Sequence, residues 1–302
     1  MRALTLAEYG GPELLTVTEL PVPTPRSGQI LVRTAASGVN PVDLLVRSGA
    51  MAENISHPFP LVLGWDLSGT VVAVGDGVDR FSPGDRVVAM SAQYATGIGT
   101  HAEYVALPAA IAAHAPRTVG QVEAAALPLA GLTAFQALEK LAPRPGERLL
   151  ISGAVGAVGG FATQLAASRG VEVIALARPQ DARLAKELGA ATVLPADEPV
   201  PAAIADVLLE TAGIAPRVIG AVRDGGRAGS IYAPEPPKAE RGITVLQTFV
   251  EQDGDQLDVL SKLVDEGVLT LRVAEVGDFS FGPEAHRRLG AGGTRGKLLL
   301  TP

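Results

Sequence analysis

The stretch that decides the fold reads Ile151-Ser152-Gly153-Ala154-Val155-Gly156-Ala157-Val158-Gly159-Gly160. It begins within the apolar run Leu149–Ile151, which predicts a buried strand, and it leads into Phe161–Arg169, which predicts a helix. A strand, a glycine-rich turn and a helix form the front half of a βαβ unit.

The glycines of this turn fit the fingerprint of a dinucleotide-binding fold, whose three special positions fall on Ala154, Gly156 and Gly159. The first position allows a tight turn, the second allows a pyrophosphate to approach the backbone, and the third allows the helix to pack closely on the strand. A glycine-rich string alone also fits a flexible turn. Here Gly170 ends the helix and Val171–Ala177 predicts a second strand, so strand, helix and strand are complete within about thirty residues. The sequence therefore predicts a nucleotide site at a helix N-terminus.

The composition limits the class of protein. The 302 residues suffice for two domains, and 47% hydrophobic with 19% charged residues indicates a globular chain. The net charge of −7 argues against nucleic acid or an anionic membrane as the main partner. The absence of cysteine excludes disulfides, a thiol nucleophile and cysteine–zinc sites. No signal peptide and no apolar run of ~18 residues is evident, so we expect a cytoplasmic protein.

Residues 1–120 predict an antiparallel, barrel-like domain, because short apolar runs alternate with Gly and Pro. The expected strands are Arg2–Leu6, Leu14–Leu20, Ile30–Ala36, Ser68–Val74, Arg86–Met90 and Glu103–Leu107.

Residues 121–255 predict a doubly wound parallel sheet, because strands alternate with helices. Ligands of such sheets bind beyond the carboxyl ends of the strands, which here include Thr211–Gly213 and Phe249-Val250. The tail 256–302 extends this sheet or returns to the first domain, and periodicity alone does not decide. The further expected helices are Gln121–Leu129, Thr133–Leu141, Asp181–Leu188, Ala215–Val222, Leu257–Glu266 and Pro283–Leu289, and the strands are Val207–Glu210, Arg227–Tyr232, Thr244–Phe249, Leu271–Val276 and Gly296–Leu300.

The choice of nucleotide depends on the residues after the second strand of the fingerprint. An acidic residue there favours NAD, whereas this chain has Arg178, which suits the 2′-phosphate of NADP. Arg183 lies a helical turn further on, and Asp181 between them is unfavourable to a phosphate. The alternative is that both arginines belong to a solvated helix start. The sequence favours NADP.

A short capped helix interrupts the β pattern between Gly38 and Gly49. Asn40 suits the N-cap and Pro41 the first helical position. The simplest interpretation of Asn40 is this cap.

Taken together, these motifs resemble the medium-chain dehydrogenase/reductase superfamily in its zinc-free quinone oxidoreductase branch. The resemblance covers nearly the whole chain in order. The motifs that carry it, besides the glycine turn, are Gly38-Val39-Asn40-Pro41-Val42-Asp43 with Arg47-Ser48-Gly49, Gly64-Trp65-Asp66-Leu67-Ser68-Gly69, Pro83-Gly84-Asp85-Arg86-Val87, Gly131-Leu132-Thr133-Ala134 and Gly296-Lys297.

The resemblance implies an α/β fold, with a GroES-like β-barrel catalytic domain at 1–120 and 256–302 around a Rossmann domain at 121–255. It implies NADPH in the cleft between them and a homodimer formed through the edge strand near Thr244–Phe249. It also implies that Asn40 lies at the nicotinamide end. With the residues at the strand ends, the expected cofactor contacts are Asn40, Thr133, Gly153, Gly156, Ala157, Val158, Arg178, Arg183, Ala212, Tyr232, Phe249, Val250 and Lys297.

A catalytic zinc needs three protein ligands, and the sequence does not offer them. Trp65 stands where zinc-dependent relatives have a ligand. Without a Lewis acid, the easiest hydride acceptors are compounds that are already electrophilic: quinones, or alkenes conjugated to a carbonyl. The four histidines show no ligand spacing and are interpreted as ordinary surface or loop residues: His57, His101, His114 and His286.

The proton for such a reduction has no obvious donor. Tyr94 is a candidate catalytic residue, or an exposed loop aromatic, and Asp43 or Asp66 is interpreted as a structural carboxylate. Some relatives carry tyrosines beside the Asn-Pro-x-Asp helix, where this chain has Leu45 and Met51. We expect Asn40 to hydrogen-bond cofactor or substrate while water delivers the proton. A biosynthetic enoyl reductase is a variant of this hypothesis, and an NADPH-binding structural or regulatory protein is the alternative.

Overall fold

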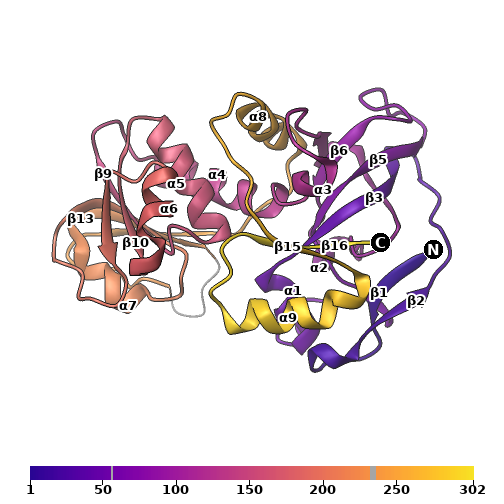
Figure 1. Cartoon of the computed structure of the whole chain (residues 1–302), viewed down its shortest axis with the longest axis horizontal. Coiled ribbons are helices and arrows are strands. Elements are labelled where there is room, and N and C mark those ends of the chain that lie inside the picture. The colour runs from indigo at the N-terminus through magenta and orange to yellow at the C-terminus, as the bar shows by residue number, and fades with distance from the viewer. Residues whose placement is uncertain (56, 232–235) are drawn as a thin grey trace. The chain divides into compact units, whose positions relative to one another are not determined.

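The chain divides into two compact units in a computed structural model that describes residues 1–55, 57–231 and 236–302. The first unit comprises Met1–Leu129 and Gln252–Pro302, and the second comprises Ala130–Glu251. Each unit has its own sheets and its own core (Figure 1).

The second unit is built on a six-stranded sheet in which every neighbouring pair is parallel. The order β11-β10-β9-β12-β13-β14 is that of a Rossmann fold, with the order reversing between β9 and β12. The prediction of a doubly wound parallel sheet is therefore confirmed. The strands are β9 (Arg148–Ser152), β10 (Glu172–Ala177), β11 (Thr192–Pro195), β12 (Ala205–Glu210), β13 (Val222–Ile231) and β14 (Thr244–Thr248).

Helices cover this sheet, and Figure 1 shows α5 and α6 beside β9 and β10. The apolar side chains of the strands are buried beneath them, as in the run Leu149–Ile151, which is fully buried. The α-helices associated with this unit are α4 (Pro128–Leu141), α5 (Ala157–Ser168), α6 (Ala182–Glu187) and α7 (Ala215–Val218).

Several predicted helices of this region are wrong in their limits, and α4 and α5 begin before the predicted starts Thr133 and Phe161. The predicted helix 121–129 is only the turn α3 (Gln121–Ala124), because Pro128 begins a new helix at its first position and α4 then continues unbroken. The predicted helix 215–222 ends as α7 at Val218, and Val222 already begins β13. The four-residue strand β11 was not expected from the sequence at all.

The first unit is organised around β3 (Gln29–Val39), the central strand of a seven-stranded sheet. One edge of β3 pairs with β5, and the other pairs first with β7 and then with β16, all antiparallel. A three-stranded sheet, β2-β1-β4, lies in the same unit. The remaining strands are β1 (Arg2–Leu6), β2 (Leu15–Glu19), β4 (Leu61–Val62), β5 (Asp66–Val74), β6 (Arg86–Met90), β7 (Tyr104–Pro108), β8 (Ala112–His114), β15 (Val273–Asp278) and β16 (Lys297–Thr301), and the helices are α1 (Pro41–Ser48), α2 (Gln93–Thr96), α3, α8 (Gly254–Asp265) and α9 (Gly282–Ala291).

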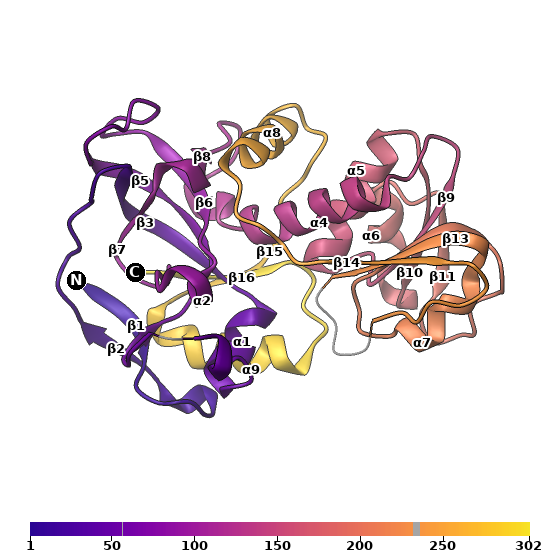
Figure 2. The same ribbon diagram turned by 180° about the vertical axis from the view of Figure 1, so that it is seen from behind.

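The tail of the chain returns to this unit. Strand β16 pairs antiparallel with β3, so that Leu298 lies opposite Val39. Figure 2 shows the yellow β16 among the indigo and purple strands. This pairing resolves the alternative that the sequence left open.

The first unit also extends further than residues 1–120 and 256–302. Ala125 packs against Ala36 and Leu299 in one buried cluster, which joins the segment after residue 120 to this unit. At the other boundary, the side chain of Gln252 accepts a hydrogen bond from the Ala92 N–H at 2.8 Å. Packing and hydrogen bonding therefore place the division near Leu129 and Gln252.

Candidate active site

The glycine turn of the second unit is shaped by backbone contacts. Gly153 adopts a left-handed conformation with φ +63°, which favours glycine. A Cβ at Gly159 would lie 2.2 Å from the carbonyl oxygen of Gly153, so no larger residue fits without opening the turn. Gly156 occupies the N-cap of α5 and donates its N–H to the Gly153 carbonyl at 2.8 Å. The turn therefore holds the helix start tightly against the end of β9.

The N-terminus of α5 offers backbone donors. Gly160 is the first residue to close an i−4 bond, to the Gly156 carbonyl at 2.9 Å. Helix geometry leaves the earlier N–H groups, those of Ala157 and Val158 among them, without an acceptor inside the helix. Such groups and the helix dipole attract an anion, so the residues present fit the pyrophosphate of a dinucleotide.

A buried carboxylate that sequence analysis missed braces the adjacent strand end. Glu210, at the end of β12, accepts hydrogen bonds from the Ser152 hydroxyl at 2.9 Å and from the Ala212 N–H at 2.7 Å. Thr211 in turn donates its hydroxyl to the Ser152 carbonyl at 2.6 Å. The loop that carries Ala212 is thereby fixed beside Gly153.

The two arginines predicted to recognise a 2′-phosphate differ in their surroundings. Arg178 follows β10 and donates to the buried carboxylate of Asp181 at 2.8 Å, which orients its guanidinium. Arg183 is 91% exposed and pairs with Glu187, as a solvated helix residue does. Asp181, expected to oppose a phosphate, has its charge matched by Arg178 instead.

The other predicted contacts of the second unit are spread over several elements. Thr133 is buried in α4, and Val250 and the exposed Phe249 follow β14. Tyr232 lies outside the described residues.

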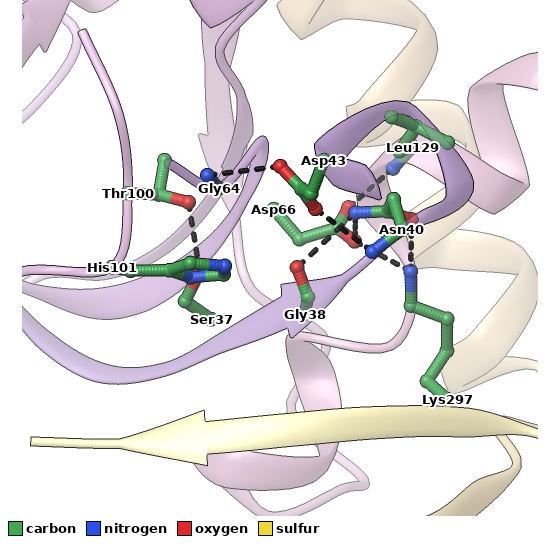
Figure 3. A network of polar contacts seen from close by, with 10 residues as sticks. All are labelled: Ser37, Gly38, Asn40, Asp43, Gly64, Asp66, Thr100, His101, Leu129 and Lys297. Atoms are coloured by element: carbon green, nitrogen blue, oxygen red, sulfur yellow. Dashed lines mark hydrogen bonds and ion pairs between the residues drawn. The ribbon is translucent and has the colours of Figure 1, made fainter. Parts of the chain in front are cut away.

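A second cluster of predicted residues lies in the first unit (Figure 3). The Lys297 ammonium, from β16, donates to the Asp66 carboxylate at 2.8 Å and to the side-chain oxygen of Asn40. The Asn40 amide nitrogen donates to the same Asp66 oxygen at 2.9 Å and to the Gly38 carbonyl at 3.1 Å. All three side chains are buried. The structure thus brings together Asn40 and Lys297, which are 257 residues apart, with Asp66 between them. We call Asn40, Asp66 and Lys297 the polar triad.

Three backbone N–H groups and a further carboxylate complete the surroundings of the triad. The Leu129 N–H donates to the second Asp66 oxygen at 2.6 Å. Asp43, in the first turn of α1, accepts from the N–H groups of Asn40 at 2.8 Å and Gly64 at 2.9 Å. Burial raises the pKa of Asp43 to about 7, against these two hydrogen bonds and the Lys297 charge, which act to lower it. Asp43 is a structural carboxylate that fixes the start of α1.

His101 is buried next to this network, contrary to its interpretation as an ordinary surface or loop residue. Its ring Nδ1 lies 2.7 Å from the Ser37 hydroxyl, which also contacts Thr100 at 2.7 Å. Burial lowers the pKa of His101 to about 3, so the ring is neutral near pH 7. His286 is likewise buried in α9, and burial lowers its pKa to about 3. The apolar surroundings that α9 shares with its neighbours were not visible in the sequence around this histidine.

Tyr94 does not join the polar triad. It lies in α2, a single helical turn, with its ring centroid 5.3 Å from that of Trp65. Sequence analysis placed it in a loop, and the structure gives it an aromatic partner within the first unit.

No three His, Asp or Glu side chains gather as metal ligands would in the part of the chain that the structure describes. In the same part, no helix has the length and apolar character needed to cross a membrane.

Comparisons with known proteins agree with this architecture. Residues 26–117 match the family model described as alcohol dehydrogenase GroES-like domain, and residues 188–300 match the one described as zinc-binding dehydrogenase. A 2-methylene-furan-3-one reductase of Solanum lycopersicum is 30% identical over 315 residues, covering 100% of this chain and 79% of the reductase. A chloroplast envelope quinone oxidoreductase homolog of Arabidopsis thaliana is 37% identical over 211 residues, which cover 68% of this chain but only 64% of the plant protein. A mycobacterial structure complexed with NADPH superposes with a TM-score of 0.83 at 27% identity, covering 100% of both chains.

The two sheets and these matches define a nicotinamide-nucleotide-dependent dehydrogenase fold, with a GroES-like and a Rossmann domain. The chain belongs to the medium-chain dehydrogenase/reductase superfamily, in its quinone oxidoreductase branch.

Proposed function

We propose that the protein reduces quinones or α,β-unsaturated carbonyl compounds with NADPH. The observation that carries this proposal is the glycine turn between β9 and α5, at the point where the strand order of a parallel sheet reverses. Two relatives bear the names of a quinone oxidoreductase and of a reductase of a conjugated ketone, which supports the substrate class. When bound, the nucleotide supplies the hydride.

We further propose that the second unit binds the nucleotide and that the first supplies the groups around the reacting atoms. In this proposal the backbone at Gly153, Gly156, Ala157 and Val158 receives the pyrophosphate. The same role of cofactor contact is proposed for Asn40, Thr133, Arg178, Arg183, Ala212, Tyr232, Phe249, Val250 and Lys297.

The preference for NADPH over NADH rests on Arg178. Its ion pair with Asp181 orients the guanidinium without removing it from solvent, since 43% of the side chain is exposed. A planar, oriented guanidinium suits a phosphate better than a ribose hydroxyl. The NADPH-bound relative supports this preference.

The chemistry we propose needs no metal. The substrate is already an electrophile, and its reduction builds negative charge that a cation can stabilise. Lys297 is the one buried lysine or arginine among the described residues, and Asp66 holds it in place. In this proposal, water supplies the proton that completes the reduction. Tyr94 is the side chain to test as an alternative proton donor.

The deciding experiment measures loss of the reduced-nicotinamide absorbance with NADPH and, separately, with NADH, against a panel of quinones and conjugated enones. We expect turnover with NADPH in preference to NADH, and we expect a chelator to leave the rate unchanged. Binding of NADPH without turnover of any acceptor would favour a structural or regulatory role. Equal use of both nucleotides would remove the argument from Arg178.

A homodimer is also proposed. Strand β14 is at the edge of the six-stranded sheet, and an unpaired edge can pair with a second copy. Gel filtration that shows a monomer only would contradict it.

A further inference from the structure

The orientation of the Asn40 carboxamide is fixed by the chemistry of its partners. An ammonium only donates, so the Asn40 atom that faces Lys297 is the oxygen. A carbonyl only accepts, so the atom that faces Gly38 is the nitrogen. Asp66 accepts at both oxygens, from Leu129 on one side and from Asn40 and Lys297 on the other. Exchange of the two ends would bring two acceptors together at Gly38 and two donors together at Lys297.

The hydrogen-bonding capacity of Asn40 is almost used up by this arrangement. Both amide protons are committed, one to Gly38 and one to Asp66. The side-chain oxygen has two lone pairs, and the Lys297 ammonium occupies one. The Asp43 N–H at the helix start bonds the Asn40 main-chain carbonyl, at 3.0 Å. Among the described residues, the Asn40 side chain can therefore accept one further hydrogen bond and can donate none.

Burial makes the arrangement rigid. Asn40, Asp66 and Lys297 are 2%, 0% and 4% exposed. Breaking the hydrogen bond from the Asn40 amide to the Asp66 carboxylate removes one of the donors that compensate a buried charge and leaves a buried N–H without an acceptor, which is costly. A substrate carbonyl would need the Asn40 amide to leave Asp66 or Gly38 before it could receive a hydrogen bond from it.

We propose that Lys297 and Asp66 are positioning residues that lock the Asn40 carboxamide as a hydrogen-bond acceptor, so that the ligand group it binds is a hydroxyl donor and not a carbonyl. The proposal has two parts. The fixed orientation of the Asn40 carboxamide, which we call the lock, is a property of the free protein. The binding of a hydroxyl to it, which we call the ligand half, rests on the proposed function. The hydroxyl belongs either to the nucleotide sugar or to the reduced product. This inference gives a direction to the expectation that Asn40 hydrogen-bonds cofactor or substrate: Asn40 accepts.

The chain suits a direct test, because it contains two asparagines, Asn40 and Asn54. Labelling with [15N]asparagine gives two side-chain amide signals, and the exposed Asn54 serves as an internal reference. We expect both Asn40 amide protons to exchange with water at least ~100-fold more slowly than those of Asn54, as buried, bonded groups do. Equal exchange at the two asparagines would overturn the lock.

A pair of variants tests whether Lys297 and Asp66 hold the lock. The double variant Lys297→Met with Asp66→Asn leaves no unpaired charge and keeps an oxygen for the Leu129 N–H. Asp66→Asn adds a third amide signal, which is identified by comparison with the spectrum of Asp66→Asn alone. We expect faster exchange at Asn40 and about a tenfold weaker Kd for NADPH, the effect of one misplaced hydrogen bond. Lys297→Arg keeps a cation, so it should retain part of the slow exchange at Asn40 and part of the NADPH affinity. Lys262→Met on the surface of α8 is the matched control. A folded double variant with unchanged exchange at Asn40 would overturn the proposal whatever its NADPH affinity, because Lys297 is itself a proposed cofactor contact.

Titration of the labelled protein identifies the donor. A shift of the Asn40 signal with NADPH alone supports the sugar hydroxyl, and a shift that requires a hydroquinone supports the product. No shift with either would overturn the ligand half. If no acceptor is reduced while Asn40 stays protected in a Lys297-dependent way, the proposed function fails and the lock stands.

Discussion

The glycine turn of the second unit and the polar triad of the first are built in opposite ways. The turn uses ten consecutive residues, and its shape comes from backbone φ angles and from the absence of side chains. The triad uses three side chains from β16, β5 and the start of α1, which meet only because two strands pair with β3. The glycine turn is formed by residues that are neighbours in the sequence, whereas the residues of the polar triad are brought together by the fold.

This difference determines what a substitution damages. A change in the turn alters a surface made for a ligand, so binding should suffer more than folding. A change in the triad leaves a buried charge without its partner, so folding should suffer more than binding.

The largest expected effect is that of Lys297→Met alone. It leaves the Asp66 carboxylate buried and without its cation, which costs about 3–5 kcal/mol of unfolding free energy. Urea unfolding followed by circular dichroism measures this. Adding Asp66→Asn should recover most of the loss, and Lys262→Met should stay within about 0.5 kcal/mol of the original chain. A single variant as stable as the original would show that the triad contributes little to folding.

Gly159→Ala tests the turn. Its Cβ would lie 2.2 Å from the Gly153 oxygen, so the turn has to open. We expect roughly a 100-fold loss of NADPH affinity by calorimetric titration, with a loss of stability of about 1–3 kcal/mol. The control is Gly220→Ala, where an added Cβ has no atom within 4 Å. Unchanged affinity in Gly159→Ala would mean that the nucleotide does not use this turn.

The pH dependence of stability sharpens the comparison, because the buried histidines belong to the first unit. Burial lowers the pKa of His286 from 6.5 to about 3. The contribution of the neutral ring to the free energy of unfolding is therefore complete above pH 6.5 and is lost as the pH falls toward 3. His286→Leu should remove this loss and gain about 2 kcal/mol at pH 5 relative to pH 8. The measurement is the unfolding free energy at both pH values, with the exposed His114→Gln as control.

Asp43 acts in the other direction. Its pKa is raised from 3.8 to about 7. The contribution of the protonated carboxyl to the free energy of unfolding is therefore complete below pH 3.8 and is lost as the pH rises through 7. Asp43 therefore cannot cause a loss of stability on acidification. If that loss persists unchanged in His286→Leu, a titrating group other than His286 and Asp43 causes it.

The smallest expected effect is that of Arg178→Ala. Removing one oriented guanidinium should lower the preference for NADPH over NADH about tenfold, as the loss of one charge-assisted hydrogen bond does. The ratio of kcat/KM for the two nucleotides measures it. Arg183→Ala should change the ratio little, because that side chain is 91% exposed. A larger effect at Arg183 would reverse the roles of the two arginines.

The same contrast explains what the sequence could predict. The βαβ unit was predictable because strand, turn and helix are contiguous and each carries its own pattern. The limits of helix 121–129 were wrong because the apolar pattern continues across Pro128, which starts a new helix. Strand β11 has four partly exposed residues and so carries little pattern.

The triad was only partly predictable. Asn40 and Lys297 were identified by family resemblance, but no periodicity relates residues 257 positions apart. Asp66 was recognised only as a structural carboxylate, and Glu210, which braces the loop beside Gly153, was missed. A buried carboxylate at the end of a strand has no signal in a single sequence, because the apolar run before it predicts the strand equally well without it.

The late position of Lys297 has a consequence for synthesis. The second unit is one continuous segment, 130–251, whereas the first is divided by it. Asp66 leaves the ribosome 231 residues before Lys297, a delay on the order of 10 to 50 seconds at ordinary elongation rates. The inserted domain can finish folding during this interval, while the nascent host domain still has a carboxylate without its counter-charge. The polar triad of the first unit can therefore form only after the second unit has been synthesised.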